Sequence, residues 1–277
     1  MTLDWTSVLL SAVFAGVVAT AVTVAIEKWG GLVGGLLGTV PSTIVPAGIG
    51  MYAAGGEDVL VMSMSVVPLG MLLNALFLGA WVVIPRWFPN APSLLVLTTV
   101  GSLVFWSLLG LVFLVAVDEV TTYLTLQQLA LAGLALLAVT AVAFNRRPQP
   151  TPKGTNRVST LVLVARGVMA ATAIGIAVGF SGLGLPTLAG LASVFPAIFL
   201  TSMVALWLAQ GPTVPQGAAG PMMLGGASVA VYANVAMWSL PAYGAAIGSL
   251  IAWIVSVAGW SLPAFMVLRK HHTKVNG

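Results

Sequence analysis

The chain alternates between long apolar runs and short segments rich in glycine, proline or polar residues. Most runs reach about 20 residues, the length at which a helix crosses the hydrocarbon core of a bilayer. Turn signals separate the runs, as at Gly30-Gly31, Gly55-Gly56 and Gly211-Pro212. The pattern predicts nine transmembrane helices. They are roughly Ser7–Ile26, Gly31–Ala54, Val59–Ile84, Leu94–Val117, Tyr123–Phe144, Thr160–Phe180, Leu185–Ala209, Gly217–Leu240 and Ala245–Leu268.

Charged residues gather between these predicted helices and separate by sign. With the N-terminus outside the cell, the cytoplasmic segments hold every lysine and arginine except Arg166, which lies inside the sixth helix. The outer segments then hold only acidic residues: Asp4, Glu57, Asp58, Asp118 and Glu119. Basic residues concentrate on the cytoplasmic side of membrane proteins. The sequence therefore predicts a multi-pass protein of the cell (inner or plasma) membrane, with its N-terminus outside and its C-terminus inside.

Composition narrows the class further. Hydrophobic residues make up 59% of the chain and charged residues 6%, against about 25% charged in soluble domains. The lipid bilayer is the expected partner, and the net charge of +4 does not indicate nucleic-acid binding. Cysteine is absent, and His271-His272 make a weak metal site alone, so no metal and no cofactor are expected. The start of the chain carries Asp4 and lacks the basic segment of a cleaved signal peptide. We therefore expect the first helix to be retained in the mature protein.

The chain also contains one apolar unit twice. When Pro41 is set against Pro196, several further positions match in the same order. These are Gly35 with Gly190, Gly56 with Gly211, Asn74 with Asn234, and Gly101-Ser102-Leu103 and Trp106 with Gly248-Ser249-Leu250 and Trp253. Four helices followed by one linking helix invert the second copy, an arrangement found in secondary transporters. The prediction is an all-α 4+1+4 fold: repeats at 1–118 and 160–268, a linking helix at 119–145, a cytoplasmic linker at 146–159 and a basic tail at 269–277.

The second half resembles the small four-helix inner-membrane proteins of the GlpM/YdgC-like family. The match lies in Ala189-Gly190-Leu191, then Phe195-Pro196, then Met237-Trp238-Ser239-Leu240-Pro241; the first half matches through Gly35-Leu36 and Pro41-Ser42-Thr43. The resemblance implies a four-helix module that pairs as two copies, with this chain as a fused tandem version. It supplies neither catalytic residues nor a substrate.

Two proline-interrupted helices are the first candidates for a site. The second helix holds Pro41 before Ser42-Thr43, and the seventh holds Pro196 before Thr201-Ser202. A proline inside a helix removes a hydrogen bond and frees a carbonyl, and transporters place such interrupted helices around their substrates. The alternative is a kink in a packed helix. On the first interpretation these prolines and hydroxyls line a substrate path.

Four further polar residues complete the candidate set. Asn74 and Asn234 each stand alone in an apolar stretch, as partners lining a central path or as hydrogen-bonded links between helices. Arg166 either faces a cavity or extends to the cytoplasmic surface. Glu27, at the cytoplasmic end of the first helix, is a candidate proton or ion-coupling residue or a solvated helix end.

These features predict a transporter that moves a small solute or ion by alternating access between two inverted repeats. The scarcity of charge within the helices favours a neutral, apolar or singly charged solute, and Arg166 favours an anion. An ion channel of the same fold and a non-transporting membrane scaffold are the alternatives. A nucleophile–base–acid set is missing, so an enzyme is not expected, and a second copy of the chain is a further candidate partner.

Overall fold

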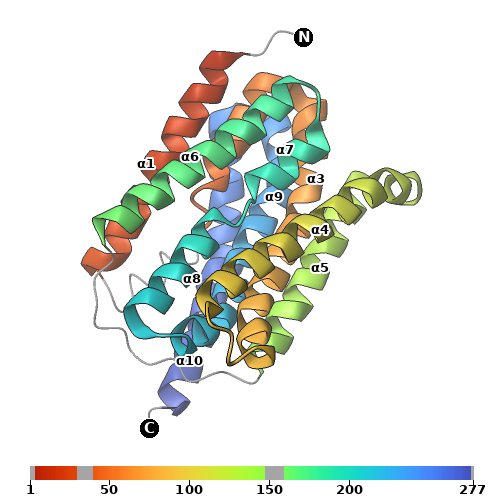
Figure 1. The fold of residues 1–277 in the computed structure, drawn as a ribbon. Coiled ribbons are helices and arrows are strands. Elements are labelled where there is room, and N and C mark those ends of the chain that lie inside the picture. Colours follow the sequence, from red (N-terminus) through yellow and green to blue (C-terminus); the bar gives the residue numbers. More distant parts are fainter. Residues whose placement is uncertain (1–3, 30–39, 147–158, 276–277) are drawn as a thin grey trace.

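The computed structural model describes residues 4–29, 40–146 and 159–275, with only the backbone of 26–29 and 270–275. No strand occurs in these stretches, which confirms the all-α prediction. The elements are α1 (Trp5–Trp29), α3 (Ile44–Trp87), α4 (Leu94–Tyr123), α5 (Leu126–Asn145), α6 (Thr160–Gly182), α7 (Pro186–Ser193), α8 (Ala197–Gln210), α9 (Thr213–Ser256), the π-helix η1 (Val257–Ser261) and α10 (Leu262–Val275). They form one elongated bundle (Figure 1).

The described part of the chain contains seven helical spans long and apolar enough to cross a membrane. Their outer faces are apolar: 76% of the surface of Val115 in α4 and 78% of that of Leu161 in α6 is exposed. Apolar side chains exposed along entire helices suit contact with lipid and not with water. Seven such spans in one chain are typical of a multi-pass membrane protein.

Two of the spans are long helices interrupted by a glycine. Gly56 in α3 (φ 77°, ψ −168°) and Gly244 in α9 (φ 77°, ψ 168°) have non-helical backbone conformations. The chain folds back at Gly244, since the Ser239 hydroxyl donates to the Gly248 carbonyl over 2.8 Å. Gly211, between α8 and α9, has almost the same conformation as Gly56 (φ 85°, ψ 176°). This backbone region is essentially restricted to glycine.

Replacing Gly56 or Gly211 by alanine should destabilise the protein by about 1–3 kcal/mol. No atom lies within 4 Å of the position that a Cβ would take at either glycine, so the loss would come from the backbone alone. Unfolding in mixed micelles, followed by circular dichroism, measures it. Gly259→Ala is the matched control, because its Cβ position is equally open and its φ is not positive. Equal stability of all three variants would contradict this account.

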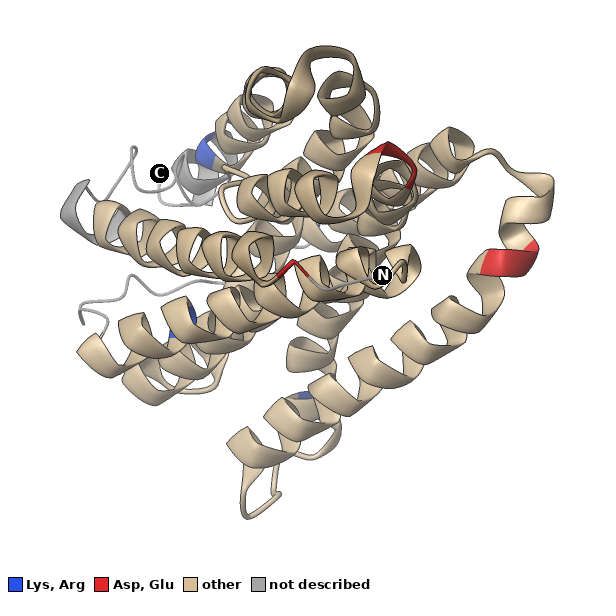
Figure 2. Ribbon diagram, turned by 90° about the horizontal axis from the view of Figure 1, so that it is seen from above, with Lys and Arg blue, Asp and Glu red and all other residues tan. Residues whose placement is uncertain are grey.

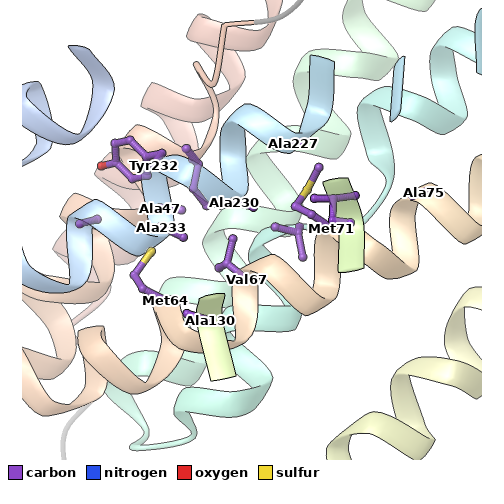
Figure 3. Close-up of a cluster of buried hydrophobic side chains, with 14 of the residues drawn as sticks. Ala47, Met64, Val67, Met71, Ala75, Ala130, Ala227, Ala230, Tyr232 and Ala233 are labelled. Atoms are coloured by element: carbon purple, nitrogen blue, oxygen red, sulfur yellow. The ribbon is translucent and has the colours of Figure 1, made fainter. Parts of the chain in front are cut away.

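The core forms where α3 packs on α9, the most extensive contact in the described part, and α1 packs on α6. Small side chains let α3 and α9 approach closely, among them Ala47 and Ala75 in α3 and Ala227 and Ala233 in α9 (Figure 3). Tyr232 of α9, buried in this contact, hydrogen-bonds to Ser249 over 2.7 Å. In lipid such close packing, rather than removal of surface from water, holds helices together.

The α1–α6 contact passes through a glycine on each helix. A Cβ on Gly16 would lie 3.0 Å from the carbonyl oxygen of Gly167, and a Cβ on Gly167 would lie 3.3 Å from the carbonyl oxygen of Gly16. The two backbones therefore touch directly at this crossing. Glycine is required here for the close approach and not for its conformation.

The described charges lie toward opposite ends of the bundle. The acidic residues stand just before α1, within α3 and near the end of α4: Asp4, Glu57, Asp58, Asp118 and Glu119. Figure 2 shows the acidic positions on parts of the chain separate from the basic ones. Arg86 closes α3 and Arg146 follows α5, both toward the opposite end, where α10 also lies (Figure 1). Asp4 accepts hydrogen bonds from Thr6 N and the Ser7 hydroxyl, and the Ser7 contact lowers the pKa of its carboxyl.

One predicted boundary was wrong. The last helical turns of α4 extend to Tyr123, past the predicted end at Val117. α9 begins at Thr213, four residues before the approximate start predicted at Gly217, because Pro215 falls in its first turn, where a missing N–H breaks no helical bond. The predicted proline-interrupted helix Leu185–Ala209 is observed as α7 and α8, separated at residues 194–196.

Candidate functional site

The interruption between α7 and α8 is a direct consequence of Pro196. Proline has no N–H and disfavours helical geometry in the residue before it. Val194 therefore ends α7 with its N–H bonded to the Leu191 carbonyl at 3.2 Å, and Pro196 precedes the first residue of α8. The Val194 carbonyl, which a continuous helix would pair internally, accepts instead from the side chain of Asn74 over 2.8 Å.

The other proline-interrupted segment precedes α3. Pro41 is buried, and Ser42 N donates to the Val40 carbonyl over 2.9 Å. Thr43 is the residue before the first turn of α3, and its side chain makes no capping hydrogen bond. The predicted second helix, Gly31–Ala54, is described only from residue 40 onward. Its first part lies outside the described residues.

These two segments line one recess. Thr43 comes from the start of α3, and Phe195, Ala197 and Ile198 come from the interruption and the start of α8. The remaining wall is formed by Ser193 of α7 and by Ala170, Ala173 and Ile174 of α6. The free volume is about 20 Å³, which is room for one water molecule. Described residues of the predicted second and seventh helices thus border one recess. That these helices frame a substrate path stays a prediction.

A buried polar cluster lies beside the recess and is centred on Arg166. Its guanidinium donates from Nη1 to the Thr23 hydroxyl at 2.9 Å, from Nη2 to the Ser202 hydroxyl at 2.8 Å and from Nε to the Thr201 hydroxyl at 3.3 Å. Only 8% of the Arg166 surface is exposed. The arginine thus joins α1, α6 and α8, and does not extend to the surface.

The recess and the Arg166 cluster share two helix faces. Arg166 and Ala170 are four residues apart on α6, and Ala197 and Thr201 are four residues apart on α8. One helical turn advances about 5.4 Å, so the cluster lies about one turn from the recess wall on both helices. Two helix starts, those of α3 and α8, border the same recess, and the start of a helix carries a partial positive charge.

The predicted site residues divide into two groups. Arg166, Thr201 and Ser202 come together. Thr43 lines the neighbouring recess, and Pro196 stands between the recess residues Phe195 and Ala197. Asn74 and Asn234 do not join them. Asn234 accepts from Gln127 over 3.2 Å and donates to the Ala230 carbonyl over 2.9 Å, so these partners lie on α5 and α9. The Glu27 side chain lies outside the described residues.

Two residues of this region were not found from the sequence. Thr23 in α1 is buried and binds Arg166, but a hydroxyl in an apolar helix is usually a packing residue that bonds its own backbone, as Thr23 also does with Ala19. The available signal was its position, on the same face as Ala15 and Ala19 at four-residue spacing. Trp106 was matched to Trp253 in the repeat, but its contact with Asn74 depends on how α4 packs.

No group of histidine, cysteine or carboxylate side chains that could hold a metal ion occurs among the described residues. His271-His272 lie outside the part whose side chains are described. The polar groups of the candidate site are therefore hydroxyls and one guanidinium, which form hydrogen bonds beside the starts of two helices. Comparison with known proteins gave no matching family model, no matching curated protein and no matching solved structure, so the GlpM/YdgC-like resemblance stays a prediction.

Proposed function

We propose that this protein is a membrane transporter that moves a small, singly negative solute by alternating access between two inverted repeats. The observation that carries the proposal is the recess between the starts of α3 and α8, with buried Arg166 one turn away. Transporters place the starts of interrupted helices against anionic groups of their substrates. A charged residue within a membrane span is by default a candidate for a functional site.

The glycine conformations support the repeat. Gly56 and Gly211, which the sequence alignment of the two halves pairs, share a rare backbone conformation. The helix contacts support it too, because α1 packs on α6 and α3 packs on α9. In the proposed repeat α1 is equivalent to α6, and the part of α3 after Gly56 is equivalent to the part of α9 before Gly244. Equivalent helices that pack on each other lie beside a two-fold axis.

The interruptions at Gly56 and Gly244 support the proposed nine spans. Splitting α3 and the stretch Thr213–Arg269 at these glycines adds two crossings to the seven helical spans. The separation of charge along the bundle supports an orientation with the start of α1 outside, because the described basic residues then face the cytoplasm.

The side chains favour a small solute with a single charge. The cluster offers guanidinium N–H groups and hydroxyls from α1 and α8, which suit a carboxylate or an inorganic oxyanion. Apart from Thr43 and Ser193, the recess wall is alanine, isoleucine and phenylalanine, so little polar surface remains for a larger polar solute. A volume of about 20 Å³ is too small for such a solute, so this geometry is a contracted state, and transport requires the recess to open.

Uptake into proteoliposomes tests the function. Purified protein is reconstituted, and uptake of radiolabelled acetate, lactate, nitrate and phosphate is measured with and without an inward proton gradient. We expect saturable uptake of at least one monoanion, and faster uptake with the gradient if Glu27 carries the coupled proton. Glu27→Gln should remove the gradient effect. Uptake no faster than in empty vesicles would reject transport of these anions. Single-channel currents would show that the protein is a channel and not a carrier.

A further inference from the structure

The interruption between α7 and α8 is held from a second side, away from α6. Asn74 in α3 and Trp106 in α4 contact its residues Val194 and Phe195, and Phe195 also lines the recess. Neither Asn74 nor Trp106 lines the recess itself. The wall of the recess is thus connected to two further helices through side chains that do not reach it.

Asn74 uses both ends of its amide. Its Nδ2 donates to the Val194 carbonyl over 2.8 Å, and its Oδ1 accepts from Trp106 Nε1 over 2.8 Å. The orientation of this amide is unambiguous, because the indole can only donate and the carbonyl can only accept. The side chain is 2% exposed. Trp106 therefore fixes which end of the amide faces Val194.

Two packing contacts complete the arrangement. The Trp106 ring meets the Phe195 ring edge to face, with centroids 5.6 Å apart and planes at 83°. Gly70, one turn before Asn74 on α3, lies against Val194: a Cβ there would be 2.4 Å from Val194 Cγ2. Val194 and Phe195 are therefore held by one hydrogen bond from a side chain to a backbone carbonyl, one aromatic contact and one close approach.

We infer that Asn74 and Trp106 form a positioning pair that fixes Phe195 in the recess wall and so sets the opening of the recess. An unpaired carbonyl within a membrane is costly, so loss of the Asn74 bond would let Val194 turn toward another donor and carry Phe195 with it. Asn74 then acts through the backbone of the interruption and does not contact the solute. The effect on transport rests on the proposed function, whereas the effect on the recess does not.

Cysteine labelling tests the pair, because the chain contains no cysteine of its own. Ile198→Cys places a single thiol in the recess wall, and its reaction rate with a small maleimide is measured in detergent and in proteoliposomes. Asn74→Leu and Trp106→Phe should each raise this rate about fivefold, the change expected for one lost hydrogen bond. The double variant should add little, because both residues act through one connection.

Trp106→Phe is the informative variant if Asn74→Leu fails to fold, because it keeps a ring against Phe195 and removes only the Nε1 donor. Asn145→Leu is the matched control. Asn145 also donates across helices to a carbonyl, that of Gly220 at 2.8 Å, but it lies on α5 and does not touch the interruption. Its loss should leave the labelling rate unchanged.

The outcomes separate the two proposals. Faster labelling together with a raised KM for uptake supports the positioning pair and the transport site. Faster labelling in a protein that transports none of the tested anions supports the pair and rejects the proposed function. Labelling rates that stay within twofold in both variants reject the pair, whether or not uptake is intact. A rate that Asn145→Leu raises equally also rejects it, since the effect would then be general loosening.

Discussion

Arg166→Ala should lower anion uptake by about 100-fold, corresponding to about 3 kcal/mol of lost charged hydrogen bonds. The guanidinium is the one described basic group buried within the bundle, and it binds hydroxyls of α1 and α8 beside the recess. Without it, a negative solute in the recess would lose a favourable charge about one helical turn away, and three hydroxyls beside the recess would lose their shared partner. Initial uptake rates in proteoliposomes, normalised to the amount of folded protein, measure the effect.

Two further variants show whether the loss of uptake is specific to the Arg166 site. Arg86→Ala removes an exposed arginine at the end of α3 and should leave uptake within twofold of the original rate. Arg166→Lys keeps the charge but cannot bond three hydroxyls with a planar fork, so it should raise KM more than it lowers kcat. Unchanged uptake by a folded Arg166→Ala protein would remove Arg166 from the site.

Gly190→Ala should destabilise the protein by about 3 kcal/mol, the upper part of the range for an overfilled contact. A Cβ on Gly190 would lie 2.3 Å from the carbonyl oxygen of Ser63 in α3 and 3.1 Å from Val66 Cβ. Because the nearest obstacle is backbone, no side chain can rotate away, and α7 must move from α3. Reversible unfolding in mixed micelles measures the loss in stability.

Gly179→Ala in α6 is the control for that experiment. Its Cβ would meet no atom within 4 Å, and alanine favours a helix over glycine by up to about 1 kcal/mol. This variant should be as stable as the original protein or more so. If Gly190→Ala matched it, the close packing of α7 on α3 would be disproved.

The sequence was most informative where a residue type has one physical meaning. Gly55-Gly56 and Gly211-Pro212 predicted breaks in the helices, and Gly56 and Gly211 both have non-helical backbone conformations. Pro196 predicted the interruption that precedes Thr201 and Ser202. Charged residues in an apolar chain lie near the ends of membrane spans, where they reach water. The five acidic residues could therefore be assigned to one side of the membrane from the sequence alone. Arg166 stood out for the same reason, as a charge away from a helix end.

Contacts between helices could not be read in the same way. Nothing in the spacing of Asn74 or Trp106 indicates that they meet, because the order in which helices pack is not encoded in hydrophobic periodicity. The pairing of Asn74 with Asn234 in the repeat gave no indication that one would hold the α7–α8 interruption and the other would bind α5. Thr23 was missed because hydroxyls in apolar helices are common.

The crossing of α1 and α6 bears on how such a bundle could move. Most helix pairs interlock through side chains that fit between one another, so sliding or rotating one helix means lifting whole rows of side chains out of register. At Gly16 and Gly167 backbone meets backbone, and the side chains beside the two glycines are short: Ala171 Cβ lies 3.2 Å from the position of a Gly16 Cβ, and Thr20 Oγ1 lies 2.5 Å from that of a Gly167 Cβ. Fewer and shorter side chains have to move when such a pair pivots than when two rows of long side chains interlock. A rocking motion of α1 against α6 would therefore meet less steric resistance at this crossing than at an interlocked one.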